Sequence, residues 1–153
     1  MKSDIDQLRD LGLLYARSVD RLDAALMSSI FTDDAILEGG GYKVQGAATI
    51  GPMVMQILKT QFLRTYHAVH NHLLTAVEPE RAEGEVYGIA HHILRKDDGL
   101  LYDHVMTMRY NDRYVKTRGR WQIARRHYVI EWTQTLPIDG FGPDDAERLR
   151  PVE

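Results

Sequence analysis

The sequence predicts an α+β fold, a cone in which three N-terminal helices cover a strongly curved, mostly antiparallel sheet. Two patterns along the chain predict it. Up to residue 63 most apolar residues recur every three or four positions, which is the spacing of helices that bury one face. After Tyr66 they recur every second position over four long segments, which is typical of strands. Because tight turns separate these segments, we expect neighbouring strands to run antiparallel.

The first part of the chain contains the predicted helices. Ser3 or Asp4 can cap the first helix, and either Asp20 or Asp23 can cap the second. Gly12 lies inside the first helix, where it costs up to about 1 kcal/mol relative to alanine, so we expect close packing there. The elements are a helix from residues 3–4 to the break at 20–23, a short helix ending at 30–31, a hairpin over 35–38 and 42–45, and a helix over 47–63.

Four long alternating segments follow the helices. They cover residues 66–77, 82–95, 101–116 and 120–133. Strands of twelve or more residues must coil strongly, and their concave face needs a cover. The three helices can supply it and leave one pocket open at the wide end. We therefore expect one domain over residues 1–135, followed by a tail over 136–153 that caps the pocket or an interface.

The composition excludes several kinds of site and partner. The chain has 153 residues, a common size for one domain, and a formal net charge of −3, which does not indicate a nucleic-acid partner. It has no cysteine, so disulfides and thiolate metal sites are excluded. No run approaches the ~18 apolar residues of a membrane helix, and the acidic N-terminus lacks the apolar stretch of a signal peptide. We expect a cytoplasmic protein with no membrane partner.

Five stretches form a characteristic set when they are taken in order. They are residues 14–23 (LYARSVDRLD), 30–35 (IFTDDA), 66–72 (YHAVHNH), 110–115 (YNDRYV) and 119–124 (GRWQIA). Together they resemble the SnoaL-like branch of the nuclear-transport-factor-2-like superfamily. The resemblance implies the same conical fold. It does not imply one function, because this scaffold hosts lyases, isomerases, cyclases, hydrolases and binding proteins.

Within this branch, three residues resemble the pattern of the bile-acid dehydratases, scytalone dehydratase and hexachlorocyclohexane dehydrochlorinase. Tyr15 and Asp20 match a tyrosine followed five residues later by an aspartate, and His70 falls where these lyases keep a histidine base. The resemblance implies that His70 is the base, that Asp20 orients it, and that Tyr15 donates a proton. Histidine titrates near neutral pH, and positioned acid–base groups typically contribute 10²–10⁴-fold to a rate.

Each of these residues also has a purely structural interpretation. Asp20 can simply cap the second helix, and Tyr15 lies on the apolar stripe of the first helix, where a buried tyrosine is common. A single histidine in a strand is more often structural than catalytic. The spacing of the three together favours the functional interpretation.

Four further residues are candidates for substrate binding. Alternation along a strand places His72 on the same face as His70, and His104 on the apolar face of the third long strand. Asp112 lies on that apolar face too, where it can be a protonated oxyanion donor, as in ketosteroid isomerases, or pair with Arg125 or a neighbouring strand. Arg125 follows apolar residues at intervals of two, so it can point into the pocket and bind an anionic group.

We expect a cofactor-independent lyase that removes water or a hydrogen halide from a hydrophobic cyclic molecule. The alternatives are an isomerase, a polyketide cyclase and a binding protein without activity. An isomerase needs a carboxylate base on the first hairpin, where Glu38 lies, but glycine follows Glu38 where an aspartate is expected.

No metal and no cofactor is expected. His91 and His92 point to opposite faces of a strand and cannot bind one ion together. His70 and His72 could, but the branch usually works without metal. The resemblance also implies a homodimer or homotrimer.

Overall fold

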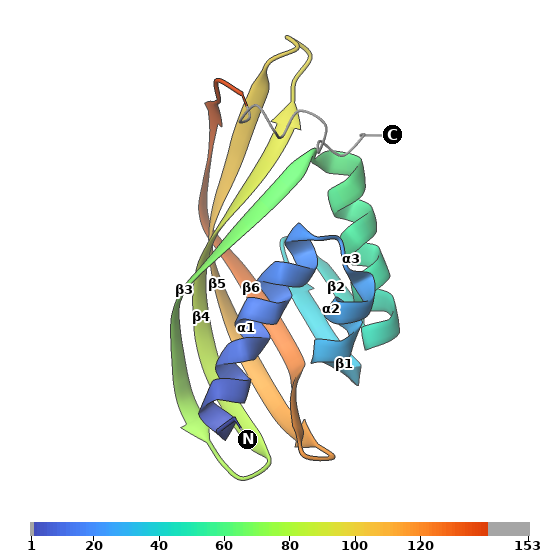
Figure 1. The fold of residues 1–153 in the computed structure, drawn as a ribbon, viewed down its shortest axis with the longest axis vertical. Helices are drawn as coiled ribbons and strands as arrows, with labels where there is room; N and C mark the ends of the chain where they lie inside the picture. The colour runs from blue at the N-terminus through green and yellow to red at the C-terminus, as the bar shows by residue number, and fades with distance from the viewer. Residues whose placement is uncertain (1, 141–153) are drawn as a thin grey trace.

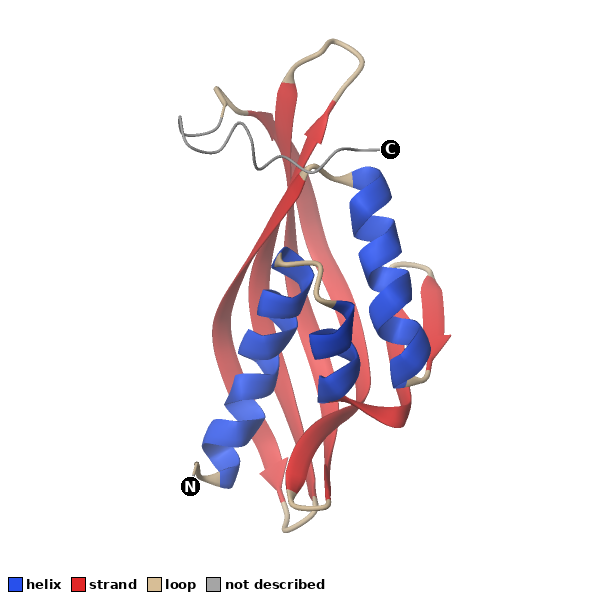
Figure 2. Ribbon diagram, turned by 45° about the vertical axis from the view of Figure 1, so that its right-hand side comes forward, coloured by secondary structure: helices blue, strands red, loops and turns tan. Residues whose placement is uncertain are grey.

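The computed structural model of the chain describes residues 2–140 and has three helices on one face of a six-stranded sheet (Figures 1 and 2). In chain order the elements are α1 (Asp4–Asp20), α2 (Ala24–Ile30), β1 (Phe31–Gly39), β2 (Tyr42–Gln45), α3 (Ala47–Gln61), β3 (Arg64–Val77), β4 (Arg81–Arg95), β5 (Leu101–Thr117) and β6 (Arg120–Pro137). The predicted α+β fold class is confirmed. The expected role of the C-terminal tail as a cap falls mostly on residues 141–153, which lie outside the described residues.

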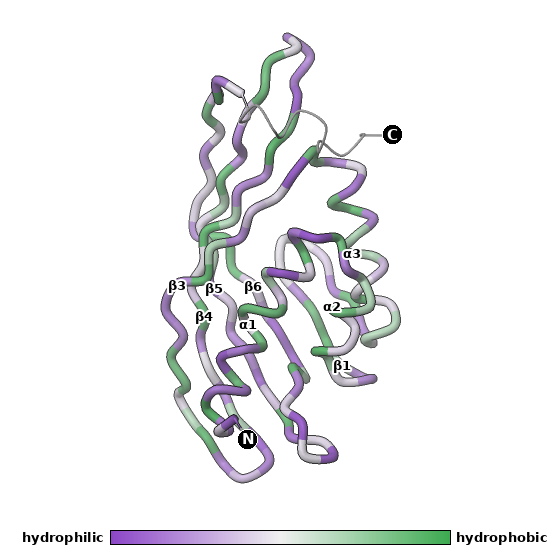
Figure 3. Tube along the Cα trace, in the orientation of Figure 1, coloured by the Kyte–Doolittle hydropathy of each residue, from purple (hydrophilic) through white to green (hydrophobic). Residues whose placement is uncertain are grey.

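The sheet has the order β2-β1-β6-β5-β4-β3. All neighbouring strands are antiparallel except β1 and β6, which are parallel. The four long strands have 14 to 18 residues each, and Figure 1 shows how strongly they twist and curve. Hydrophobic and hydrophilic residues alternate along them (Figure 3), because one face of each strand packs under the helices.

Side-chain caps fix where the first two helices begin. The Ser3 hydroxyl accepts a hydrogen bond from the backbone N–H of Asp6 at 3.2 Å. Asp23 Oδ1 accepts one from the N–H of Leu26 at 2.8 Å, so Asp23 caps α2. Asp20 is the last residue of α1 and does not cap α2. Its carboxylate is therefore available for other partners.

Register shifts in β3 and β6, two in each strand, change which side chains face the helices, and two of them lie near the candidate site. β3 has one extra residue between Val69 and His72 relative to its partner β4. β6 has one extra residue, Ala124, between Ile123 and Arg125 relative to its partner β5. Beyond each bulge the alternation continues with the opposite parity, since one inserted residue shifts a period of two by half a cycle.

The apolar core lies between the helices and the concave face of the sheet. Leu8 and Met27 from the helices and Leu37 and Ile123 from the strands have no exposed surface. No helix among residues 2–140 is both long and apolar enough to cross a membrane.

Candidate functional site

A cavity of about 370 Å³ lies between α1, α3 and the concave face of the sheet. Its wall is formed by tyrosine, methionine, aliphatic and histidine side chains. Tyr15 enters from α1, His67 from β3, His92 from β4 and Tyr110 from β5. Apart from the two histidines, no described residue of the wall can carry a charge near neutral pH. The cavity therefore suits an uncharged, largely apolar molecule the size of one or a few rings.

Asp20 and His67 form a hydrogen-bonded pair at the edge of this cavity. Nδ1 of His67 lies 2.7 Å from Oδ1 of Asp20, and the backbone N–H of His67 donates to Oδ2 at 2.9 Å. Because an ionised carboxylate only accepts, Nδ1 carries the hydrogen. The ring lines the cavity, so Nε2 is the nitrogen left to act there as a base.

The surroundings of Asp20 keep it ionised. The Thr65 hydroxyl donates to Oδ1 at 3.0 Å, in addition to the two bonds from His67. Partial burial opposes ionisation, but these hydrogen bonds outweigh it and lower the pKa of Asp20 below its ordinary value. A carboxylate that stays charged can fix the tautomer of His67 and stabilise its protonated form.

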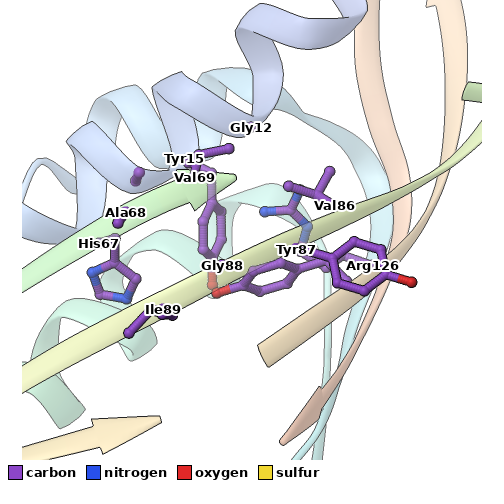
Figure 4. A pocket seen from close by; sticks show the side chains of 12 residues that line it. Gly12, Tyr15, His67, Ala68, Val69, Val86, Tyr87, Gly88, Ile89 and Arg126 are labelled. Carbon is purple, nitrogen blue, oxygen red and sulfur yellow. The ribbon is translucent and has the colours of Figure 1, made fainter. Parts of the chain in front are cut away.

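Tyr15 lies beside this pair on α1 and points toward the sheet. In Figure 4 its ring descends from α1, with His67 on one side and Arg126 on the other. The Arg126 guanidinium is 4.3 Å from the centre of the Tyr15 ring and 4.5 Å from that of Tyr110. Burial raises the pKa of Tyr15 well above its ordinary value, so its hydroxyl stays protonated and can donate a hydrogen bond.

Arg126 is held by a buried ion pair behind the cavity. It is 1% exposed, and its Nε and Nη2 donate to the two carboxylate oxygens of Asp112 at 2.8 and 2.6 Å. The Tyr114 hydroxyl donates to the same carboxylate at 2.8 Å and lies 3.1 Å from Nε2 of His72. This network fixes the position of the guanidinium against the ring of Tyr15.

Of the three predicted residues, Tyr15 lines the cavity and Asp20 bonds to a histidine of its wall, but that histidine is His67 and not His70. His70 is exposed, because Thr65, His67 and Val69 face the helices and alternation along β3 turns position 70 to the other face. The expected contact between Asp20 and His70 is therefore replaced by the contact with His67. The sequence contained this histidine within the motif at residues 66–72, but the family resemblance pointed to His70.

The four residues predicted to bind substrate lie outside the cavity wall. His72 belongs to the buried network, and His104 bonds through Nδ1 to the Thr135 hydroxyl at 2.8 Å. Asp112 is the partner of Arg126 and not of Arg125. Arg125 is turned outward by the bulge at Ala124, so the expectation that it points into the pocket is wrong.

Glu38 does not line the cavity either, since it pairs with Arg125, whose Nε donates to Oε1 of Glu38 at 2.8 Å. The wall therefore lacks the carboxylate that an isomerase would use as its base. Within residues 2–140, no three histidine, aspartate or glutamate side chains are grouped closely enough to hold a metal ion.

The sequence profile of the SnoaL-like domain family matches residues 2–127. The chain belongs to this family. No curated protein sequence matches the chain as a relative. The SnoaL-like domain places it in the nuclear-transport-factor-2-like superfamily, as the resemblance in the sequence implied.

Solved structures share the fold. A candidate scytalone dehydratase from Novosphingobium aromaticivorans DSM 12444 is 19% identical, with a TM-score of 0.75 over 92% of each chain. The hexachlorocyclohexane dehydrochlorinase LinA-type3 from Novosphingobium barchaimii LL02 is 19% identical, with a TM-score of 0.73 over 91% of this chain and 97% of the other. A Mycobacterium tuberculosis protein of unknown function is 21% identical, with a TM-score of 0.71 over 84% and 76%. At these identities the similarity shows a shared SnoaL-like fold and nothing finer.

Proposed function

We propose that this SnoaL-like protein is a cofactor-independent lyase that eliminates water or a hydrogen halide from an uncharged cyclic substrate. The observation that carries the proposal is the pair formed by Asp20 and His67 at the wall of an apolar cavity. A histidine with one nitrogen fixed by a carboxylate and the other facing a bound molecule is suited to remove a proton from carbon. The dehydratase and dehydrochlorinase named among the similar structures support this reaction class.

The proposed reaction begins when Nε2 of His67 takes a proton from a substrate carbon. The electron pair of the broken C–H bond forms the new double bond, and the leaving group on the next carbon departs with its own electron pair. Asp20 stabilises the positive charge that forms on His67. The Tyr15 hydroxyl donates a hydrogen bond to the leaving group, hydroxide or halide, on which negative charge develops, and the nearby Arg126 guanidinium favours that charge. The proton on His67 then passes to the departing hydroxide or to solvent.

A binding protein without activity is the main alternative, since the same cavity could hold a ligand without reaction. The isomerase has less support because Glu38 pairs with Arg125 instead of entering the cavity. Measuring turnover and binding in the same variants separates the lyase from the binding protein.

The test uses a panel of hydroxylated and chlorinated ring compounds, with product formation followed by mass spectrometry. For a compound that the wild type converts, we expect His67→Ala to lower kcat by at least about 10²-fold while the protein still binds the compound. The matched control is His70→Ala on the same strand, which should leave kcat unchanged because His70 is exposed. If His67→Ala keeps wild-type turnover, or if His70→Ala loses as much activity, the assignment of the base is wrong. If the wild type binds panel compounds but converts none, the binding protein is favoured.

A further inference from the structure

The cavity contains a second buried histidine that the proposed reaction does not use. His92 on β4 is 5% exposed, and its ring forms part of the cavity wall. The ring packs against Phe62, with 4.6 Å between ring centres, and stands nearly perpendicular to the ring of His67 at 5.5 Å. These contacts hold the His92 ring in one orientation next to the proposed base.

One nitrogen of His92 is occupied by the sheet. Nδ1 lies 3.2 Å from the backbone carbonyl oxygen of His104 on β5. A carbonyl oxygen only accepts hydrogen bonds, so Nδ1 carries the hydrogen. Burial lowers the pKa of His92 to about 4, and the neighbouring His67 acts in the same direction. The ring is therefore neutral near neutral pH, and its Nε2 keeps a free lone pair.

The other nitrogen of His92 opens on the cavity. Four described side-chain atoms are sealed from solvent without a hydrogen-bond partner, namely His72 Nδ1, Asp103 Oδ1, Arg109 Nε and Trp121 Nε1. Nε2 of His92 is not one of them, and among residues 2–140 it accepts no hydrogen bond from the protein. Since the ring lines the cavity, this acceptor faces whatever molecule the cavity holds.

We propose that His92 determines substrate specificity by accepting, at Nε2, a hydrogen bond from a hydroxyl group of an uncharged, ring-sized substrate. The assignment rests on the proposed function, because it describes the ligand of the same cavity. A halogen or an ether oxygen cannot donate a hydrogen bond, so a ligand with only such groups leaves Nε2 desolvated and unpaired. Sites with a fixed polar partner reject analogues that lack the matching group. His92 thus favours a hydroxylated substrate over a halogenated one.

Two probes that differ in one hydrogen-bond donor test the assignment. 2-Naphthol donates through its hydroxyl, whereas 2-methoxynaphthalene has the same rings and cannot donate. We expect the wild-type protein to bind 2-naphthol about tenfold more tightly, as measured by isothermal titration calorimetry. Equal affinity for the two probes in the wild type would overturn the assignment.

Two substitutions of His92 separate its nitrogens. His92→Asn retains an N–H near the position of Nδ1, so it can keep the bond to the His104 carbonyl, but it has no atom at the position of Nε2. It should lose the preference for 2-naphthol. His92→Gln can place an amide oxygen near the position of Nε2 and should therefore keep part of the preference for 2-naphthol. As a control, His70→Ala removes an exposed histidine that is not part of the wall and should keep the preference. Full preference in His92→Asn contradicts the assignment.

A measurement on the unmutated protein covers the case in which the His92 variants do not fold. In ¹⁵N NMR spectra, the Nε2 resonance of His92 should shift when 2-naphthol binds and should change much less with 2-methoxynaphthalene. A shift of equal size with both probes contradicts the assignment.

The two proposals fail in different ways. A preference for 2-naphthol without turnover of any panel compound rejects the lyase and supports the assignment of His92. Turnover without that preference supports the lyase and rejects the assignment.

Discussion

His67 Nδ1 lies 2.7 Å from Asp20 Oδ1, and the backbone N–H of the same histidine donates to the other carboxylate oxygen. One carboxylate at the end of α1 thus holds both the main chain and the ring of a residue 47 positions away. Because the two hydrogen bonds share one carboxylate, the position of the His67 ring depends on how the end of α1 lies against β3. This relationship links the stability of the fold to the orientation of the proposed base.

Replacing Asp20 by asparagine should change how stability depends on pH. The hydrogen bonds from His67 and Thr65 lower the pKa of Asp20 in the folded protein below its ordinary value of 3.8. A lowered folded-state pKa contributes stability that is present above the unfolded-state pKa and is lost as the pH falls through the folded-state pKa. The difference in free energy of unfolding between wild type and Asp20→Asn should be constant above about pH 5 and shrink below about pH 4. Urea unfolding from pH 2.5 to 6 measures it, and a difference that grows toward low pH contradicts the interpretation.

The Thr65 hydroxyl should affect the proposed base, His67, only through its hydrogen bond to Asp20. Its buried hydroxyl donates to Asp20 Oδ1, and valine has nearly the same shape without the donor. We expect Thr65→Val to lose about 1 kcal/mol of stability and to raise the pKa of Asp20, as read from its carboxyl ¹³C NMR resonance. Thr60→Val provides the matched control, since the Thr60 hydroxyl on exposed α3 surface bonds only to backbone carbonyls of its own helix. An unchanged Asp20 pKa in Thr65→Val contradicts the prediction.

Removing one partner of the buried ion pair between Asp112 and Arg126 should lower the free energy of unfolding more than replacing both partners by apolar residues. Asp112→Asn leaves the Arg126 guanidinium buried without a full counter-charge, so we expect a loss of about 3–5 kcal/mol in the free energy of unfolding. The double variant Asp112→Leu with Arg126→Met removes both charges and should be more stable than Asp112→Asn. Urea unfolding of the three proteins tests this. A double variant less stable than the single one would show that the pair itself stabilises the fold.

The order of the elements could be predicted from the sequence because each has its own period and clear breaks. The helices and the four long strands lie within a few residues of where the periodicity places them. Tyr15 and Asp20 were recognisable through the family resemblance of residues 14–23, and both lie on the regular helix α1. The chemistry of the two residues remains a proposal.

Part of the error in the candidate site has a physical cause, the β-bulges at Ala124 in β6 and between Val69 and His72 in β3. Alternation predicts the inward face of a strand only while its register is regular, and one extra residue reverses every later position. In β6 the extra residue puts Arg126 rather than Arg125 inside, whereas in β3 His67 lies before the bulge and faces the helices by regular alternation from Thr65. No glycine or proline marks either bulge, so local sequence did not reveal them.

Two helix glycines should respond to alanine in opposite ways. At Gly12 in α1 the nearest atoms to an added Cβ would be Val86 Cγ1 at 3.7 Å and Val69 Cγ1 at 3.8 Å, which are ordinary contacts. Close packing therefore does not require this glycine, and Gly12→Ala should gain about 0.5–1 kcal/mol through its higher helix propensity.

Gly51 in α3 is the matched comparison. Its added Cβ would lie 2.5 Å from the backbone oxygen of Ala24 in α2, so Gly51→Ala should lose about 1–3 kcal/mol because the two helices must separate. Thermal and urea unfolding of both variants measure the two effects. Since Gly12 lies one turn before Tyr15, the turnover of Gly12→Ala also shows whether tighter packing of α1 leaves the proposed donor in place. A loss of stability in Gly12→Ala would mean that α1 lies closer to β3 and β4 than these contacts indicate.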